Sequence, residues 1–140
     1  MNPRLEHANL VVRDIDATLN FVRAAFPAFR IRHDGTDASG RRWVHVGTDE
    51  AYIALQAAVI EPAEHWVPYT GRPGVNHLGW EVDDVQALRQ RLQEHGYVDS
   101  TISNGHPHRS RVYFHDPDGN DWEFVQYHST DPALRHDYEG

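Results

Sequence analysis

The sequence predicts an α+β fold that consists of two tandem β-α-β-β-β modules, whose strands form a curved mixed sheet. In each half, a short stretch of alternating apolar residues leads into a stretch with helical spacing, and several strand-like stretches follow. His7 and His77 begin these two patterns, 70 residues apart in a chain of 140. Similar residues recur at the same offset: Val12 and Val82, Asp14 and Asp84, Ile15 and Val85, Ala17 and Ala87. The chain therefore carries an internal duplication.

The first module is expected at residues 4–57. It opens with the stretch "LEHANLVV", a strand whose faces differ: Ala8, Leu10 and Val12 lie on one, and His7, Asn9 and Val11 lie on the other. A helix should begin after Asp14, because a short carboxylate can cap the first turn, and it should end before Pro27. Gly and Asp turn signals then separate three predicted strands, at 29–35, 41–47 and 50–56.

The second module is expected at residues 75–128 and repeats this order. Its helix should be capped by Asp83 or Asp84 and end at Gly96. Its predicted strands are at 76–82, 97–103, 111–115 and 121–127.

The stretch between the modules, residues 58–74, contains three Pro and two Gly, so it is interpreted as an irregular linker with at most one short helical turn. Residues 129–140 are mostly polar and are expected to form a surface tail.

The composition excludes several classes of protein. The formal net charge of -8 argues against a nucleic acid partner, because an acidic surface repels phosphates. The absence of Cys excludes disulfides, thiolate metal ligands and a Cys nucleophile. No apolar run approaches the roughly 18 residues of a membrane-spanning helix, and the N-terminal residues lack a signal-peptide pattern. The expectation is therefore a soluble cytoplasmic protein that has neither a membrane nor a nucleic acid partner.

The alternation of side chains between the two faces of a strand identifies three candidate metal ligands. His7 and His77 lie opposite the apolar faces of their strands, and Glu123 lies opposite its neighbours Trp122 and Phe124. If the two halves form one curved sheet, these three side chains can converge inside it. Two imidazoles and one carboxylate make the facial triad that holds Fe(II) and leaves open positions for substrate and O₂.

The stretch "DPDGNDWE" also explains how Glu123 could be positioned. Pro117 presets its φ angle and Gly119 accepts an unusual conformation, so the turn starts the following strand in a fixed register.

These features resemble the vicinal oxygen chelate superfamily, which includes glyoxalase I, extradiol ring-cleaving dioxygenases, fosfomycin-resistance transferases and bleomycin-binding proteins. The resemblance extends to residue 127 and rests on the duplicated modules, the strand-borne His residues and "DPDGNDWE". Residues 104–123 are similar to the extradiol dioxygenase signature of a His, an aliphatic residue with Tyr, Asp-Pro-x-Gly and a ligand Glu. The matching residues are His106, Val112, Tyr113, Asp116, Pro117, Gly119 and Glu123.

The resemblance implies a metal-dependent dioxygenase that cuts a small catechol-like molecule beside its two vicinal oxygens. Fe(II) is the metal it implies first, with Mn, Ni and Zn as alternatives. Tyr113 and His106 would be the catalytic residues beside the catechol oxygens, and His108 could take the place of His106. Proteins of this kind are usually dimers, so a homodimer is expected.

One departure separates this chain from glyoxalase I, which carries a fourth ligand on the last strand of its first half. That position is Ala54 here, which argues against isomerase chemistry, although Gln56 on the same strand face could complete the metal shell. A glyoxalase I-like lyase or isomerase therefore stays an alternative, as does a metal-free binding protein of the bleomycin-resistance kind. The sequence leaves open the substrate, the metal and whether the modules pair within or between chains. Trp66, Tyr69 and Phe29 are candidates for lining an aromatic pocket.

Overall fold

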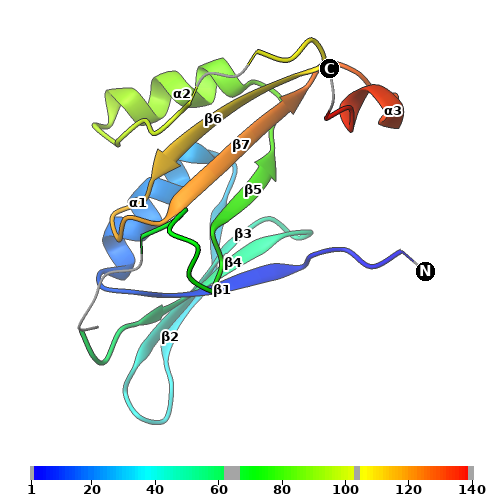
Figure 1. The fold of residues 1–140 in the computed structure, drawn as a ribbon. Coiled ribbons are helices and arrows are strands. Elements are labelled where there is room, and N and C mark those ends of the chain that lie inside the picture. The colour runs from blue at the N-terminus through cyan, green and yellow to red at the C-terminus, as the bar shows by residue number, and fades with distance from the viewer. Residues whose placement is uncertain (1, 62–66, 103–104, 139–140) are drawn as a thin grey trace. The chain divides into compact units, whose positions relative to one another are not determined.

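The structure is a computed structural model that describes residues 2–61, 67–102 and 105–138, and it divides into two compact units, Met1–His65 and Trp66–Gly140. Each unit contains the elements of one module (Figure 1). The first holds β1 (His7–Val12), α1 (Ile15–Ala25), β2 (Arg30–Thr36), β3 (Arg42–Gly47) and β4 (Tyr52–Ala57). The second holds β5 (His77–Glu81), α2 (Val85–Glu94), β6 (Arg109–His115), β7 (Asp121–Tyr127) and α3 (Pro132–Arg135).

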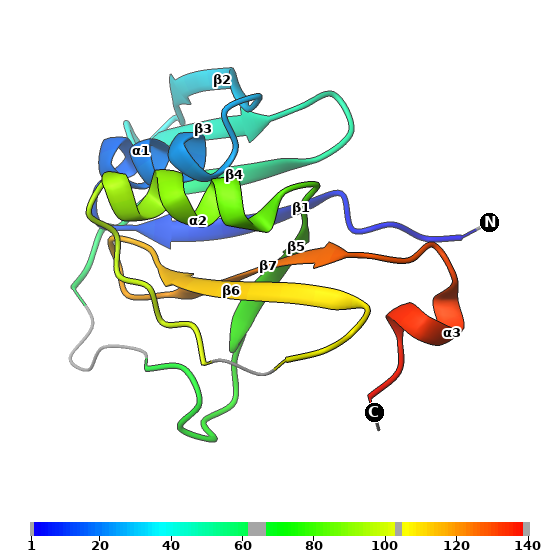
Figure 2. The ribbon, with the colours of Figure 1, turned by 90° about the horizontal axis from the view of Figure 1, so that it is seen from above.

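The predicted fold class, α+β with two modules built on mixed sheets, is confirmed. The strands of the first unit have the order β1-β4-β3-β2, which can be followed in Figure 2, and those of the second have the order β5-β7-β6. In both units the module's first strand pairs in parallel with its last, and the remaining pairs are antiparallel. The strands thus hydrogen-bond into two sheets, one in each unit, and not into one continuous sheet.

The two helices begin with the same kind of N-cap at equivalent positions of the two modules. Asp14 and Asp84 are the N-caps of α1 and α2, and each side chain accepts a hydrogen bond from the amide three residues on, at 3.1 Å from Ala17 and 3.0 Å from Ala87. Asp84, and not Asp83, is therefore the cap of the second helix. Among the described residues, no helix combines the length and the hydropathy that crossing a membrane requires.

The end of α2 is a Schellman motif around Gly96. The Tyr97 amide donates to the Leu92 carbonyl at 3.1 Å, and the Gly96 amide donates to the Gln93 carbonyl at 3.0 Å. This geometry places Gly96 at φ 80°, which only Gly adopts without strain. The predicted helix stop is thus confirmed.

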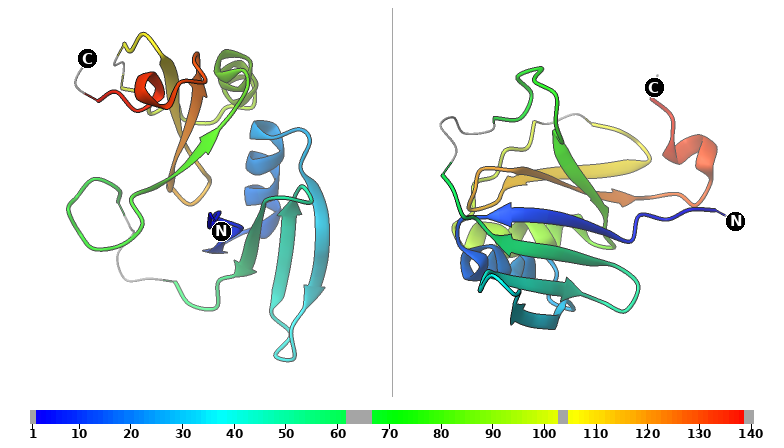
Figure 3. Two further views of the ribbon diagram at one scale, coloured as in Figure 1. Left: turned by 90° about the vertical axis from the view of Figure 1, so that its right-hand side faces the viewer. Right: turned by 90° about the horizontal axis from the view of Figure 1, so that it is seen from below.

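Each unit buries one face of its sheet under its helix. In the first unit α1 covers the sheet (Figure 3), and the buried core is formed by Val12, Ile15, Phe21, Val22, Val44, Val46, Ile53 and Leu55. In the second unit the core is formed by Val85, Leu88, Leu92, Val112, Phe114, Trp122 and Phe124. On β7 the buried Trp122 and Phe124 flank Glu123, so the alternation predicted for this strand is observed.

The strand predicted at 97–103 is reduced, among its described residues 97–102, to one isolated bridge, between Asp99 and Phe114. Two backbone bonds join the segment to β6, from the Ser100 amide to the Tyr113 carbonyl at 2.9 Å and from the His115 amide to the Val98 carbonyl at 3.0 Å, and side chains make the neighbouring bonds. The Asp99 carboxylate accepts from the Thr101 amide at 2.9 Å, and the Thr101 hydroxyl accepts from the Tyr113 amide at 3.0 Å. Such local side-chain bonds compete with regular strand pairing.

Residues 129–138 of the expected tail lie at the surface, and α3 and the residues after it also make contacts with the rest of the second unit. Helices α2 and α3 lie on opposite sides of the β6–β7 pair (Figure 3). The Arg135 guanidinium donates to Glu81 at 3.0 Å and stacks over the Tyr127 ring at 4.1 Å. Arg109 donates from Nη1 to the carbonyls of Arg135 and Asp137, at 2.9 and 3.0 Å. These contacts anchor the C-terminal segment to the sheet.

The turn before β7 is organised by the buried carboxylate of Asp116. It accepts hydrogen bonds from the amides of Asp118 and Asn120, both at 2.9 Å, and from the indole nitrogen of the buried Trp122 at 3.1 Å. Burial raises the pKa of Asp116 above its usual value, so these hydrogen bonds offset the cost of placing a carboxylate there.

We expect Asp116→Ala to lower the free energy of unfolding by about 3 kcal/mol, because it removes the buried acceptor of the Trp122 indole and of two amides of the turn. Urea denaturation followed by tryptophan fluorescence measures this change. The matched control is Asp83→Ala, at an exposed position, for which the change should stay within about 0.5 kcal/mol. Equal stability of the two variants would contradict this account of the turn.

Candidate metal-binding site

The candidate site of the second unit lies on the sheet face opposite the buried side chains. The strand register places Glu123 between Gly79 on β5 and Tyr113 on β6. The Nε2 atom of His77 lies 2.9 Å from a carboxylate oxygen of Glu123. The ring of Tyr113 is edge-on to the His77 ring, with 5.9 Å between centroids. Three of the residues selected from the sequence are thus brought together.

The other ring nitrogen of His77 faces a short hydrogen-bonded chain. His77 Nδ1 lies 3.4 Å from Tyr69 Oη and 3.4 Å from Asn76 Nδ2. The Tyr69 hydroxyl donates to Asp121 at 2.7 Å, and Asn76 Oδ1 accepts from the Tyr69 amide, so the Asn76 group that faces His77 Nδ1 is the donor Nδ2. His77 Nδ1 is thus an acceptor in this structure, and Nε2 carries the proton that is donated to Glu123 at 2.9 Å. A metal bound by His77 and Glu123 would take the place of this proton.

His7 is the equivalent histidine of the first unit. It lies on β1 with its Nδ1 atom 2.6 Å from the carboxylate of Glu6, and its ring stacks on Tyr52 with 4.8 Å between centroids. The hydrogen bond from His7 lowers the pKa of Glu6, which keeps this carboxylate ionised as the acceptor. Nε2 of His7 is therefore the nitrogen available for a ligand.

The register also identifies the counterpart of Glu123 in the first unit. Glu123 pairs with Gly79, two residues after His77, and Ala54 pairs with Asn9, two residues after His7. Ala54 is buried and cannot bind a metal, and Gln56 follows on the same strand face. The structural duplicate of the carboxylate position thus carries no ligand.

Tyr113 is half-buried, and its hydroxyl is held in the neutral form. Burial raises the pKa of Tyr113 to about 12, and the negative charge of Glu123 adds to this effect. The side chain is therefore a hydrogen-bond donor at neutral pH.

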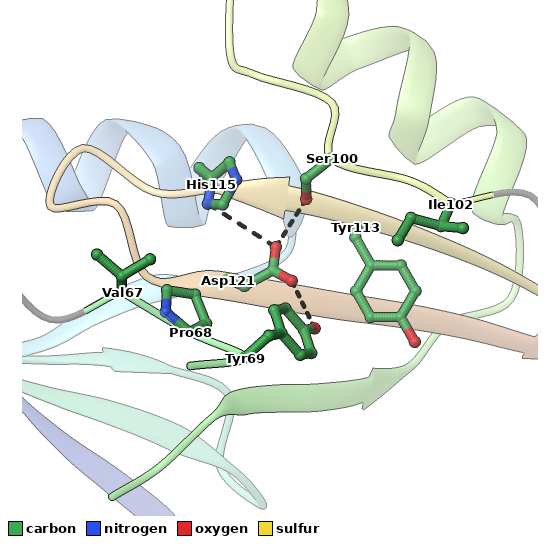
Figure 4. Close-up of a pocket in the computed structure, with 8 residues that line it drawn as sticks. All are labelled: Val67, Pro68, Tyr69, Ser100, Ile102, Tyr113, His115 and Asp121. Carbon is green, nitrogen blue, oxygen red and sulfur yellow. Dashed lines mark hydrogen bonds and ion pairs between the residues drawn. The ribbon is translucent and has the colours of Figure 1, made fainter. Parts of the chain in front are cut away.

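A cavity of about 510 Å³ opens beside Tyr113 (Figure 4). The residues that line it are Val67, Pro68, Tyr69, Ser100, Ile102, Tyr113, His115 and Asp121. Asp121 is 3% exposed and accepts from the hydroxyls of Tyr69 and Ser100, both at 2.7 Å. It therefore holds the segment that carries Tyr69 against the sheet.

Asp121, Ser100 and His115 were not selected from the sequence. Asp121 lies two residues before Glu123, so strand parity alone could have identified it. Of the three aromatic residues expected to line a pocket, Tyr69 does so. Phe29 packs against Phe26 in the first unit, with 4.7 Å between ring centroids, and Trp66 lies outside the described residues.

The contacts of His106 lie with the C-terminal segment. Its Nε2 atom is 2.9 Å from the carbonyl of Asp137, and its Nδ1 atom accepts from the amide of His108 at 3.1 Å. Both ring nitrogens thus serve backbone groups, and the catalytic role of His106 stays a prediction without support from these contacts. Among the described residues, no three His, Asp or Glu side chains gather closely enough to hold a metal. The grouping of His7 with His77 and Glu123 likewise stays a prediction.

If His77 is a metal ligand, Tyr69→Phe should weaken binding of Mn(II) by about 10- to 100-fold, because the Tyr69 hydroxyl, 3.4 Å from Nδ1, is the group that can accept the Nδ1 proton once a metal occupies Nε2. Titration of the metal-free protein with Mn(II) measures the affinity. Tyr138→Phe is the control, since Tyr138 belongs to the docked C-terminal segment and stacks under Arg109. An unchanged affinity in Tyr69→Phe would show that Tyr69 does not orient His77.

Residues 4–124 match the sequence profile of a family described as the Glyoxalase/Bleomycin resistance protein/Dioxygenase superfamily. A curated relative, the probable trivalent organoarsenical cleaving enzyme of Bacillus subtilis (strain 168), is 24% identical over 139 residues, which cover 94% of this chain and 85% of that protein.

Solved structures share the fold at low sequence identity. The glyoxylase/bleomycin resistance protein/dioxygenase domain from Frankia sp. EAN1pec has a TM-score of 0.74 and 20% identity, over 91% of this chain and 99% of that chain. The fosfomycin resistance protein FosX from Mesorhizobium loti has a TM-score of 0.67 and 19% identity, over 93% and 94%. FosX from Listeria monocytogenes, in a complex with Mn(II) and sulfate ion, has a TM-score of 0.67 and 16% identity, over 96% and 98%.

Proposed function

Because the chain belongs to the Glyoxalase/Bleomycin resistance protein/Dioxygenase superfamily, we propose that it is a divalent-metal-dependent enzyme that acts on a small molecule. The proposed ligands are His7, His77 and Glu123. The observation that carries the proposal is that His77 Nε2 and a carboxylate oxygen of Glu123 converge at 2.9 Å, while His7 has Nδ1 beside the Glu6 carboxylate, which leaves its Nε2 for a metal. Two nitrogen ligands and one carboxylate suit the first-row divalent ions.

A divalent metal bound by these residues would supply a Lewis acid for two vicinal oxygens of the substrate and, as Fe(II), a partner for O₂. The protein's own residues supply the rest. Tyr113 offers a neutral hydroxyl beside Glu123 and donates a proton or hydrogen bond to a substrate oxygen. The cavity next to Tyr113 accommodates the body of a small substrate between apolar side chains and the Asp121 network.

The reaction we propose is the ring opening of a catechol-like molecule by O₂, with Fe(II) as the metal. Support comes from the dioxygenase-like signature at 104–123 and from Ala54, which leaves the position equivalent to Glu123 without a ligand. The curated relative is named for cleaving trivalent organoarsenicals, but the present chain has no Cys with which to bind soft trivalent arsenic as a thiolate.

A second candidate is chemistry on a substrate with vicinal oxygens that needs no O₂. One FosX structure from Listeria monocytogenes is a complex of an E126Q mutant with Mn(II) and 1S,2S-dihydroxypropylphosphonic acid, which is a vicinal diol. A site that combines a Lewis acid with the neutral Tyr113 hydroxyl suits such a reaction as well as it suits ring opening.

The test is to load the metal-free protein with Fe(II) or Mn(II) under anaerobic conditions, add a panel of catechols, and admit O₂. We expect O₂ consumption and a ring-opened product with Fe(II). If no catechol is consumed but the hemithioacetal of glutathione and methylglyoxal is converted, the lyase alternative is correct. If the protein binds no metal at all, the enzyme proposal fails and the binding-protein alternative gains support.

We further propose that the protein is a homodimer, since one such module has little core of its own and the modules could pair between chains. Light scattering at micromolar concentration should give twice the chain mass of 16.1 kDa. The mass of a single chain would refute the dimer.

A further inference from the structure

A second cavity, of about 530 Å³, lies in the same unit and shares Gly79 and Glu123 with the candidate site. Three arginines and two glutamates line it, together with aromatic side chains of β7 and of the C-terminal segment. The lining therefore has one positive charge in excess, in a chain whose formal net charge is -8. A cationic cavity in an acidic protein needs a physical explanation.

Two of the three arginines are committed to holding the C-terminal segment. Arg109 is 8% exposed, donates to two backbone carbonyls and stacks over the Tyr138 ring at 5.0 Å. Arg135 pairs with Glu81 and stacks over Tyr127. The positions of Arg109 and Arg135 in the cavity wall are therefore explained by these contacts with the C-terminal segment and its neighbours.

Arg111 is different. It lies on β6, two residues before Tyr113, with 22% of its side chain exposed. Among the described residues, its ionic contact is with Glu123, and that contact is long, at 3.9 Å from Nη1 to Oε1. Glu123 turns its other oxygen to His77 at 2.9 Å. A guanidinium carries five donors, and Arg111 lines the cavity, so it has donors to offer to a group bound there.

We propose that Arg111 forms an anion subsite that binds an oxoanion group of the substrate, a carboxylate or a phosphonate, next to the metal-binding end of the sheet face. A guanidinium binds either group through two parallel hydrogen bonds, with geometry that a lysine cannot reproduce. The inference deepens the proposed function and rests on it for the role of Glu123. It narrows the substrate to a small anion that also carries vicinal oxygens.

Binding of the metal should increase the affinity of this site for the anion, and binding of the anion should increase its affinity for the metal. In the metal-free protein, Glu123 is the nearest counter-charge of Arg111. When Glu123 serves a divalent cation, its charge is shared with that cation, and Arg111 becomes more attractive to an incoming anion. We therefore expect Mn(II) to tighten anion binding.

The experiment is calorimetric titration of the full-length protein at low salt with methylphosphonate and with acetate, in metal-free and in Mn(II)-loaded samples. Both methylphosphonate and acetate are expected to bind, and the anion that binds more tightly identifies the preferred oxoanion. Arg111→Gln should weaken binding of the tighter probe by about 10-fold or more, the loss of a charge-assisted pair. Arg111→Lys should restore part of it. Arg23→Gln, at an exposed position on α1, is the matched control and should bind as the unmodified protein does.

The metal-free sample distinguishes the proposed anion subsite from the proposed metal-dependent function, because in that sample the anion cannot be bound by Mn(II). Anion binding that depends on Arg111 in a protein that takes up no Mn(II) supports the subsite while the proposed function fails. Equal binding by the unmodified protein and Arg111→Gln, or no binding by the unmodified protein, overturns the subsite. If Arg111→Gln does not fold, dimethyl methylphosphonate replaces it as the comparison: this neutral ester should not bind, and equal binding of ester and anion also overturns the proposal.

Discussion

Replacing His77 by alanine should abolish stoichiometric metal binding. The change removes one of three proposed ligands and leaves Glu123 without the imidazole that lies 2.9 Å away. Metal content, measured after loading with Fe(II) or Mn(II) and extensive dialysis, should fall from about one ion per chain to a background level. A single carboxylate and a single imidazole do not retain a first-row ion through dialysis.

The control is His95→Ala, because His95 lies at the C-terminal end of α2 and its ring contacts the carbonyl of Arg91. This variant should hold as much metal as the unmodified protein. Stoichiometric metal in the double variant His7→Ala/Glu123→Ala would contradict the proposed ligand set, since that protein would keep only one proposed ligand.

Tyr113→Phe should keep the metal and lose about 10²-fold in turnover, the lower end of what one lost acid–base contact costs. The phenyl ring still fills the space between His77 and the cavity, so only the hydroxyl is removed. Because burial raises the pKa of Tyr113, this hydroxyl stays protonated around neutral pH. The ratio of the two rates should therefore be constant between about pH 6 and pH 8.

Steady-state kinetics on the substrate found in the catechol panel, at several pH values, give this ratio, and metal analysis accompanies every sample. Tyr97→Phe is the matched control, because Tyr97 follows the Schellman motif at the end of α2. A rate ratio that changes tenfold per pH unit would mean that Tyr113 acts as an ionised base. Unchanged turnover would remove Tyr113 from the reaction.

Most of the fold follows from local signals in the sequence. The caps of both helices, the stop at Gly96 and the alternation in β1, β5 and β7 all depend on near neighbours in the chain. The missed elements also have local causes. Asp99 and Thr101 used their side chains to bond backbone groups where a strand was expected. Asp131 before Pro132 is a helix-start signal, and it begins α3 inside the supposed tail.

Site residues on strands could be predicted from the alternation of side chains, whereas site residues on loops could not. Alternation alone places Glu123 on the face of β7 that meets His77, and Asp121 on the same face. The position of Tyr69 depends on a loop conformation with φ 67°, which is rare for a residue other than Gly. That conformation is held by the Tyr69 amide donating to Asn76 at 2.7 Å and by the hydroxyl bond to Asp121, and neither contact has a sequence signature.

The parallel pairing of β5 with β7 affects the order in which the second unit folds. Antiparallel β6 and β7 are joined by a short turn, so they can form a hairpin early. Strand β5 must wait for the closure of a long loop that contains α2 and the whole of β6, and such non-local pairing is slow. His77 and Glu123 face each other across this late pairing. If His77 and Glu123 are metal ligands as proposed, a chain in which β5 has not yet paired with β7 therefore lacks the proposed site, and metal binding has to follow this pairing.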